Sequence, residues 1–128
     1  MTGTLPDFDQ DDLAAAIERL PPEALNTLPF GAIRLNAGGE VVVFNDAEKR
    51  LSGFGDRPAL GRHFFTQIAP CMNQPGFRGR IDRALAAGDA EIEFGWIGDF
   101  SSPERELRVR VTPATGGGCW ILIRRETA

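Results

Sequence analysis

The chain has 128 residues, of which 42% are hydrophobic and 25% are charged. This composition supports a single folded core and argues against both a disordered chain and a second domain. Fourteen Lys and Arg stand against eighteen Asp and Glu, which gives a net charge of -4. Because binding to a nucleic-acid backbone needs a basic surface, we expect no nucleic-acid partner.

The sequence given predicts neither a secreted nor a membrane-spanning protein. Its first residues lack a basic start and an apolar segment, and no window approaches about 18 consecutive apolar residues. Two cysteines are too few for the disulfide framework of a small secreted domain, and with one histidine they make no structural zinc set. We therefore expect a cytoplasmic protein with no membrane association.

The first part of the chain is predicted to form a helical cap. Residues 9–20 carry three apolar anchors at helical spacing behind an acidic first turn, and two prolines end this pattern. A second helical turn is expected near residues 24–28. The prediction is one domain in which residues 1–28 cap a core of residues 29–128.

Five short runs have the character of β-strands. The first two, at residues 31–35 and 40–44, flank an Asn-Ala-Gly-Gly segment that is typical of a hairpin turn. Later runs of alternating or continuous apolar residues predict three more strands, at residues 90–96, 106–111 and 119–125.

Two helices are predicted between the second and third strands. Asn45 is suited to cap the segment DAEKRLS, which Gly53 can end, and residues 75–87 place apolar side chains on one face. The order of elements predicts an α+β, PAS-like fold, in which a five-stranded antiparallel sheet carries helices over one face and an N-terminal helical cap. In such a fold the helices can enclose a ligand cavity, although the fold alone identifies no ligand.

Helical spacing places Glu48 near one face with Phe44, Leu51 and Ser52, so that its carboxyl looks inward. A carboxylate in a core is costly to ionise unless it is paired, and it would then stay protonated and donate a hydrogen bond. The alternatives are a position at the rim of the cavity, in contact with water, or a pair with a nearby arginine.

Cys71 follows Ile-Ala-Pro in a constrained segment between helices, where its thiol could face a cavity or simply fill space as a small buried hydrophobe. Cys119 belongs to the last strand and is expected to be structural. His63 has no nucleophile at convincing spacing and is expected to face solvent or to cap a helix. No nucleotide-binding, hydrolase or metalloprotease motif occurs, so an enzyme is not expected.

The segments PFGAIRL, VVVFNDAE, GRHFF, IAPC and CWILIRR occur in this order and at spacings that resemble the photoactive yellow protein family, from Leu25 to Arg125. The resemblance implies a blue-light photoreceptor of the PAS fold. Its chromophore would be p-coumaric acid (4-hydroxycinnamic acid), held as a thioester on the cysteine of the APC motif, which is Cys71 here.

The resemblance also assigns the surroundings of the chromophore. The proton-donating glutamic acid falls on Glu48 and its supporting threonine on Ser52. The phenolate-binding tyrosine falls on Phe44 and the gate arginine on Phe54, so one strong donor and the gate guanidinium are missing. The remaining aromatic positions fall on Phe64, Trp96 and Phe100.

In the mechanism that the resemblance implies, light isomerises the bound double bond, Glu48 protonates the phenolate, and an unpaired buried carboxylate destabilises the packed state. The N-terminal cap then loosens toward a signalling partner that the sequence does not identify. We expect a monomer or a weak dimer. The rival hypothesis is a PAS interaction module without a chromophore, in which aromatic side chains fill the cavity as core, namely Phe44, Phe54, Phe64 and Trp96.

Overall fold

The computed structural model describes residues 6–88, 91–98 and 104–125. Its α-helices are α1 (Leu13–Glu18), α2 (Asp46–Ser52) and α3 (Arg80–Ala87). Its strands are β1 (Gly31–Leu35), β2 (Val41–Phe44), β3 (Ile92–Ile97), β4 (Glu106–Pro113) and β5 (Cys119–Arg125). Short 3₁₀ segments span Pro22–Thr27 and Pro70–Met72, and single π-helical turns span Phe64–Ile68 and Pro75–Gly79.

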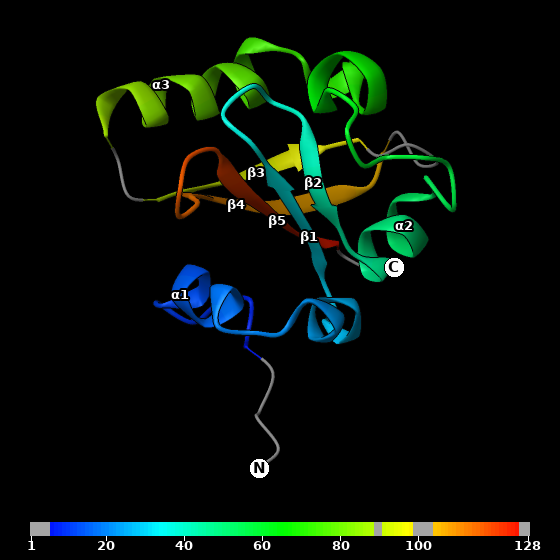
Figure 1. The fold of residues 1–128 in the computed structure, drawn as a ribbon. Coiled ribbons are helices and arrows are strands. Elements are labelled where there is room, and N and C mark those ends of the chain that lie inside the picture. Colours follow the sequence, from blue (N-terminus) through cyan, green and yellow to red (C-terminus); the bar gives the residue numbers. More distant parts are fainter. Residues whose placement is uncertain (1–5, 89–90, 99–103, 126–128) are drawn as a thin grey trace.

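The strands form one sheet in the order β2-β1-β5-β4-β3, and every neighbouring pair is antiparallel. Figure 1 shows the N-terminal helical segments on one side of the sheet and α3 with the preceding helical turns on the other. The predicted five-stranded antiparallel sheet of a PAS-like α+β fold is thus confirmed. We call the side that carries α3 the inner face and the side that carries the N-terminus the outer face.

Each face has its own hydrophobic core, because successive side chains of a strand point to opposite faces. In β5, Cys119, Ile121 and Ile123 belong to the inner core, whereas Trp120 and Leu122 belong to the outer core. The outer core otherwise consists largely of N-terminal side chains, including Phe8, Leu13, Ile17, Leu25, Leu28 and Phe30.

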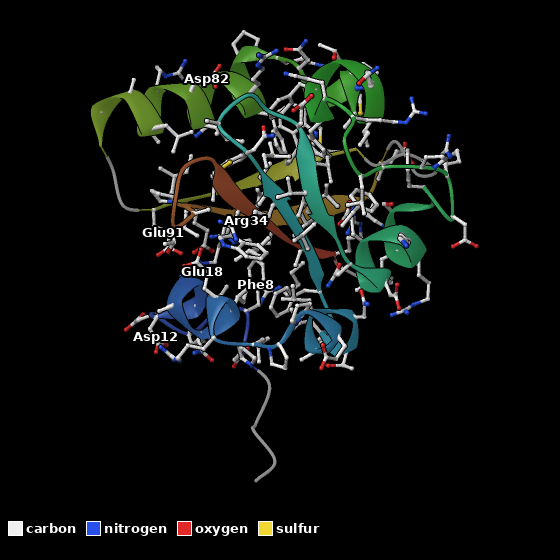
Figure 2. All side chains as sticks on the ribbon, viewed as in Figure 1. Phe8, Asp12, Glu18, Arg34, Asp82 and Glu91 are labelled. Atoms are coloured by element: carbon white, nitrogen blue, oxygen red, sulfur yellow. The ribbon has the colours of Figure 1, made fainter. Side chains whose placement is uncertain are left out.

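The N-terminal cap, residues 6–28 of the described chain, is held by more than the three helical anchors that the sequence indicates. Phe8 is also buried, and Arg110 of β4 donates hydrogen bonds to the carbonyl oxygens of Phe8 and Gln10. At the end of α1, the Glu18 carboxylate accepts hydrogen bonds from Thr115 and from the Trp120 indole. Figure 2 shows Phe8 and Glu18 pointing from the cap toward the sheet.

Two predicted helices are shorter than expected. The first begins at Leu13 and not at residue 9, and the predicted helix 75–87 divides into a π-helical turn followed by α3. Pro75, Gly76 and Gly79 explain the division, because proline and glycine are the poorest helix formers. Leu85, expected on the buried face, is 38% exposed near the end of α3.

Candidate functional site: a buried carboxylate beside an aromatic core

Asn45 fixes the start of α2, the helix that carries Glu48 and Ser52. Its buried side chain accepts hydrogen bonds from the backbone N–H groups of Ala32 and Glu48, at 2.9 and 3.0 Å. It also donates to the carbonyl oxygens of Leu25 and Phe30, at 2.8 and 3.1 Å. The predicted N-cap is therefore confirmed, and one amide ties α2 to β1 and to the N-terminal cap.

Glu48 lies in the first turn of α2 and forms a buried ion pair with Arg125 of β5. The Arg125 Nη1 and Nη2 atoms lie 2.8 and 2.9 Å from Glu48 Oε1 and Oε2, and both side chains are 1% exposed. This is a two-pronged, charge-assisted contact, the strongest kind that a carboxylate makes with an arginine. Of the alternatives open from the sequence, pairing with an arginine is the one observed.

Arg125 reaches this position because of its place in the strand. It follows Cys119, Ile121 and Ile123 at every second residue, so its side chain leaves the sheet on the inner face. In the pairing of β4 with β5, Arg125 lies opposite Leu107, whose side chain is also part of the inner core.

Gly31 of β1 provides the space that the ion pair occupies. A Cβ atom at this position would lie 2.0 Å from Glu48 Oε1 and 3.1 Å from Arg125 Nη1. Any other residue would therefore displace the carboxylate, the guanidinium or the strand. The GAI segment of the sequence thus begins with a glycine for a steric reason.

The end of α2 carries the next site residues. The Ser52 hydroxyl is fully buried and accepts a hydrogen bond from the Phe54 N–H at 3.0 Å, just beyond the left-handed Gly53 that ends the helix. The Phe44 and Phe54 rings lie 5.3 Å apart. Although position 54 lacks an arginine, the Arg57 guanidinium lies 4.3 Å from the centre of the Phe54 ring.

The other aromatic candidates surround the same inner core. Phe64 is buried, and half-buried Trp96 packs against the inner core and edge-on to Phe77, with ring centres 5.3 Å apart. Phe44, Phe54 and Phe64 all belong to this core. The structure therefore brings four of the five predicted aromatic residues together, whereas Phe100 lies outside the described residues.

Cys71 lies on the 3₁₀ segment Pro70–Met72 and is exposed, between the buried side chains of Ala69 and Met72. The interpretation of Cys71 as a small buried hydrophobe is thus wrong, and the structure does not place its thiol in the inner core. Cys119 is buried as expected. Burial raises the pKa of its thiol to about 12, with a smaller contribution from the charge of Asp82, so Cys119 stays protonated at neutral pH.

The remaining expectations concern His63 and bound metal. His63 is half-buried at the start of the turn Phe64–Ile68, and its side chain makes no capping hydrogen bond there. In the part of the chain that the structure describes, no group of three or more His, Cys, Asp or Glu side chains could hold a metal ion. Within the same residues, no helix combines the length and apolarity needed to cross a membrane.

The chain is similar to known proteins over most of its length. The PAS fold family matches residues 25–126. A photoactive yellow protein from Rhodothalassium salexigens is 33% identical over 119 residues, which cover 92% of this chain and 95% of the relative. The chain belongs to the photoactive yellow protein family. The photoactive yellow protein of Halochromatium salexigens is 30% identical over the same shares of the two chains.

A solved structure agrees with this membership. The photoactive yellow protein domain from the sensor histidine kinase Ppr of Rhodospirillum centenum superposes with a TM-score of 0.76 at 32% identity. The match covers 87% of this chain and 98% of that domain. The likeness therefore extends over most of this chain and almost all of that domain.

The described residues supply the kinds of group that a covalently attached aromatic chromophore needs. Such a group needs a thiol that an acyl donor can reach, apolar surroundings and a polar partner for its phenol oxygen. Cys71 is exposed, the inner core is rich in aromatic rings, and Glu48 and Ser52 supply polar atoms within the buried region. In this structure the Glu48 carboxylate is paired with the guanidinium of Arg125.

Sequence reasoning did not find Arg125, Gly31 or Arg57. For Arg125 a signal was present, because the period of two in CWILIRR puts it on the same face as three apolar residues. The role of Gly31 depends on a contact across the fold with α2, and that of Arg57 on the path of a loop, so neither has a local signature.

Proposed function

We propose that this protein is a blue-light photoreceptor that carries p-coumaric acid as a thioester on Cys71. Membership of the photoactive yellow protein family, together with an exposed thiol at the APC cysteine, carries the proposal. Attachment would join Cys71 Sγ to the acyl carbon of an activated p-coumaroyl thioester. The thiol of the donor would leave with the Cys71 proton, so atoms and charge balance.

The chromophore would supply a double bond that light converts from trans to cis. With the chromophore bound, one carboxyl oxygen of Glu48 would carry a proton toward the phenolate in the dark, in place of one of its two bonds to Arg125. Glu48 would give up that proton after illumination. Ser52 would support this hydrogen bond, and the aromatic rings of the inner core would exclude water. Loosening of the N-terminal cap would then present a new surface to a downstream signalling protein in the cytoplasm, from a monomer or a weak dimer.

Reconstitution with activated p-coumarate tests the attachment. We expect the wild type and Cys71→Ala to differ, with a mass increase and a visible absorption band only in the wild type. Cys119→Ala is the matched control and should behave as the wild type. A band that survives in Cys71→Ala, or one that is lost in Cys119→Ala, contradicts attachment at Cys71.

A PAS interaction module without a chromophore is the second candidate. One observation favours it, because Phe44, Phe54 and Phe64 are packed as core side chains while Cys71 is exposed. The same experiment separates the two functions. An unchanged mass and no visible band in the wild type would support the interaction module.

A further inference from the structure

Proton transfer from Glu48 would leave a buried carboxylate, and in this protein a buried guanidinium lies beside it. The inference drawn here rests on the proposed function. We propose that Arg125 is the counter-ion of the Glu48 carboxylate in the illuminated protein, and that this pairing limits how far the N-terminal cap loosens. The expectation that an unpaired carboxylate drives the loosening would thereby be revised.

The charge of the buried region supports this role. With the proton on Glu48, the positive charge of Arg125 balances one phenolate. Once the proton has moved to the phenolate, the same guanidinium balances the Glu48 carboxylate. The net charge of Glu48, Arg125 and the chromophore is therefore zero before and after proton transfer. Without Arg125 the net charge of Glu48 and the chromophore would be -1 both before and after proton transfer. A buried charge without a partner costs several kcal/mol.

The geometry shows that the pair is built into the fold. The two atoms of each group meet at 2.8 and 2.9 Å, and both side chains are almost wholly removed from water. Gly31 leaves the space that they fill. Because water cannot solvate a carboxylate there, the guanidinium stabilises its charge.

The position of Arg125 also explains why the N-terminal cap would respond. The preceding residue, Arg124, bonds Asp9 of the cap at 2.8 Å, and its guanidinium lies 5.0 Å from the centre of the Phe8 ring. The end of β5 is thus shared between the cap and the ion pair. Retaining the Arg125 contact after proton transfer would keep this end of the strand in place.

Arg125→Gln tests the proposal, with Arg108→Gln as the matched control. Arg108 is an exposed arginine of β4 that pairs with Glu93, so its loss leaves the inner face unchanged. In the chromophore-free protein, infrared difference spectra against Glu48→Gln should show a carboxylate band for the wild type and for Arg108→Gln. For Arg125→Gln they should show the band of a protonated carboxylic acid.

In the reconstituted protein, hydrogen exchange of residues 6–28 is compared between dark and light. We expect the light-induced increase to be several-fold larger in Arg125→Gln than in the wild type, and unchanged in Arg108→Gln. Arg125→Lys keeps the positive charge but loses the two-pronged contact, so its light-induced increase should lie between those of the wild type and Arg125→Gln. If Arg125→Gln does not fold, the comparison of Arg125→Lys with the wild type tests the proposal.

Three outcomes overturn the inference. The first is a carboxylate band that persists in Arg125→Gln, and the second is a light-induced increase in Arg125→Lys and Arg125→Gln equal to that of the wild type. The third is failure of every variant to acquire a visible band, which overturns the proposed function and the light-state role together. In that case the infrared result of the chromophore-free protein still shows separately whether Arg125 holds Glu48 ionised.

Discussion

Arg124 and Arg125 are consecutive residues of β5, yet they bind partners on opposite faces of the sheet. Arg124 bonds Asp9 of the N-terminal cap, and Arg125 bonds Glu48 of α2. The alternation of side chains along a strand produces this division. A shift of this strand end would therefore affect the cap and the buried carboxylate at once.

The first prediction concerns the stability of the chromophore-free protein. Arg125→Ala leaves the Glu48 carboxyl buried without its guanidinium, and we expect the free energy of unfolding to fall by about 3–5 kcal/mol. Urea unfolding followed by circular dichroism measures this loss. The exposed pair Arg108–Glu93 is the control, and Arg108→Ala should cost about 1 kcal/mol or less.

Removal of both charges sharpens this test. The double variant Glu48→Leu with Arg125→Met leaves no buried charge, so it should be more stable than Arg125→Ala. Equal losses for Arg125→Ala and Arg108→Ala would mean that water reaches Glu48, against the burial described above.

The second prediction concerns Asn45. Asn45→Asp keeps an acceptor for the Ala32 and Glu48 N–H groups but loses the donor to the carbonyl oxygens of Leu25 and Phe30. The Leu25 oxygen keeps the hydrogen bond from the Leu28 N–H, so the Phe30 oxygen is the one that loses its donor. Because a buried polar group left without a partner costs about 1–3 kcal/mol, a loss of that size is expected.

Asn73→Asp is the control for this substitution. Asn73 is exposed and accepts a hydrogen bond from Arg78, a contact that an aspartate retains. Thermal unfolding should therefore show a large decrease in Tm for Asn45→Asp and almost none for Asn73→Asp. Similar values for the two would show that the donor side of the Asn45 amide contributes little.

The third prediction concerns pH and the attachment of the N-terminal cap. Burial alone would raise the pKa of Glu18, but hydrogen bonds from Thr115 and Trp120 and the charge of Arg34 outweigh burial and leave the pKa below its ordinary value. A carboxyl with a lowered folded-state pKa stabilises the fold above its unfolded-state pKa. This contribution is lost as the pH falls through the lowered value.

Acidification should therefore loosen the cap before it unfolds the sheet. Trp120 fluorescence and hydrogen exchange of residues 6–28, measured from neutral to acid pH, would follow the change. In Glu18→Gln the cap should be looser at neutral pH and respond less to acid. Glu23 is an exposed residue of the 3₁₀ segment Pro22–Thr27, so Glu23→Gln should behave as the wild type. If the cap of Glu18→Gln loosens in acid as much as that of the wild type, groups other than Glu18 cause the loosening.

The sequence was sufficient for features that depend on local spacing. All five strands, the cap at Asn45 and the inward direction of Glu48 follow from periodicity and from the preferences of single residues. The partner of Glu48 and the contacts of Arg110 with the cap join segments far apart in the chain, and periodicity carries no information about such pairs. The exposed position of Cys71 likewise depends on how its 3₁₀ segment packs.

The last prediction concerns Phe44, the position to which the family resemblance assigns the phenolate-binding tyrosine. Phe44 ends β2 next to Asn45, and its buried ring lies 5.3 Å from that of Phe54. With fewer donors at the phenolate, its negative charge should be more delocalised, which lowers the excitation energy. Phe44→Tyr adds a donor and should move absorption of the reconstituted protein to shorter wavelength.

The same substitution should lower the pH at which the phenolate protonates in the dark, because an added hydrogen bond to an anion favours the anion. Absorption spectra recorded through a pH titration measure both effects. Phe30→Tyr adds a hydroxyl on the outer face and should change neither. If Phe44→Tyr reconstitutes normally but neither the absorption maximum nor the titration midpoint moves, then Phe44 does not take the place of the tyrosine. The assignment of Glu48 and Ser52 to the phenolate would then fail, even with the chromophore on Cys71.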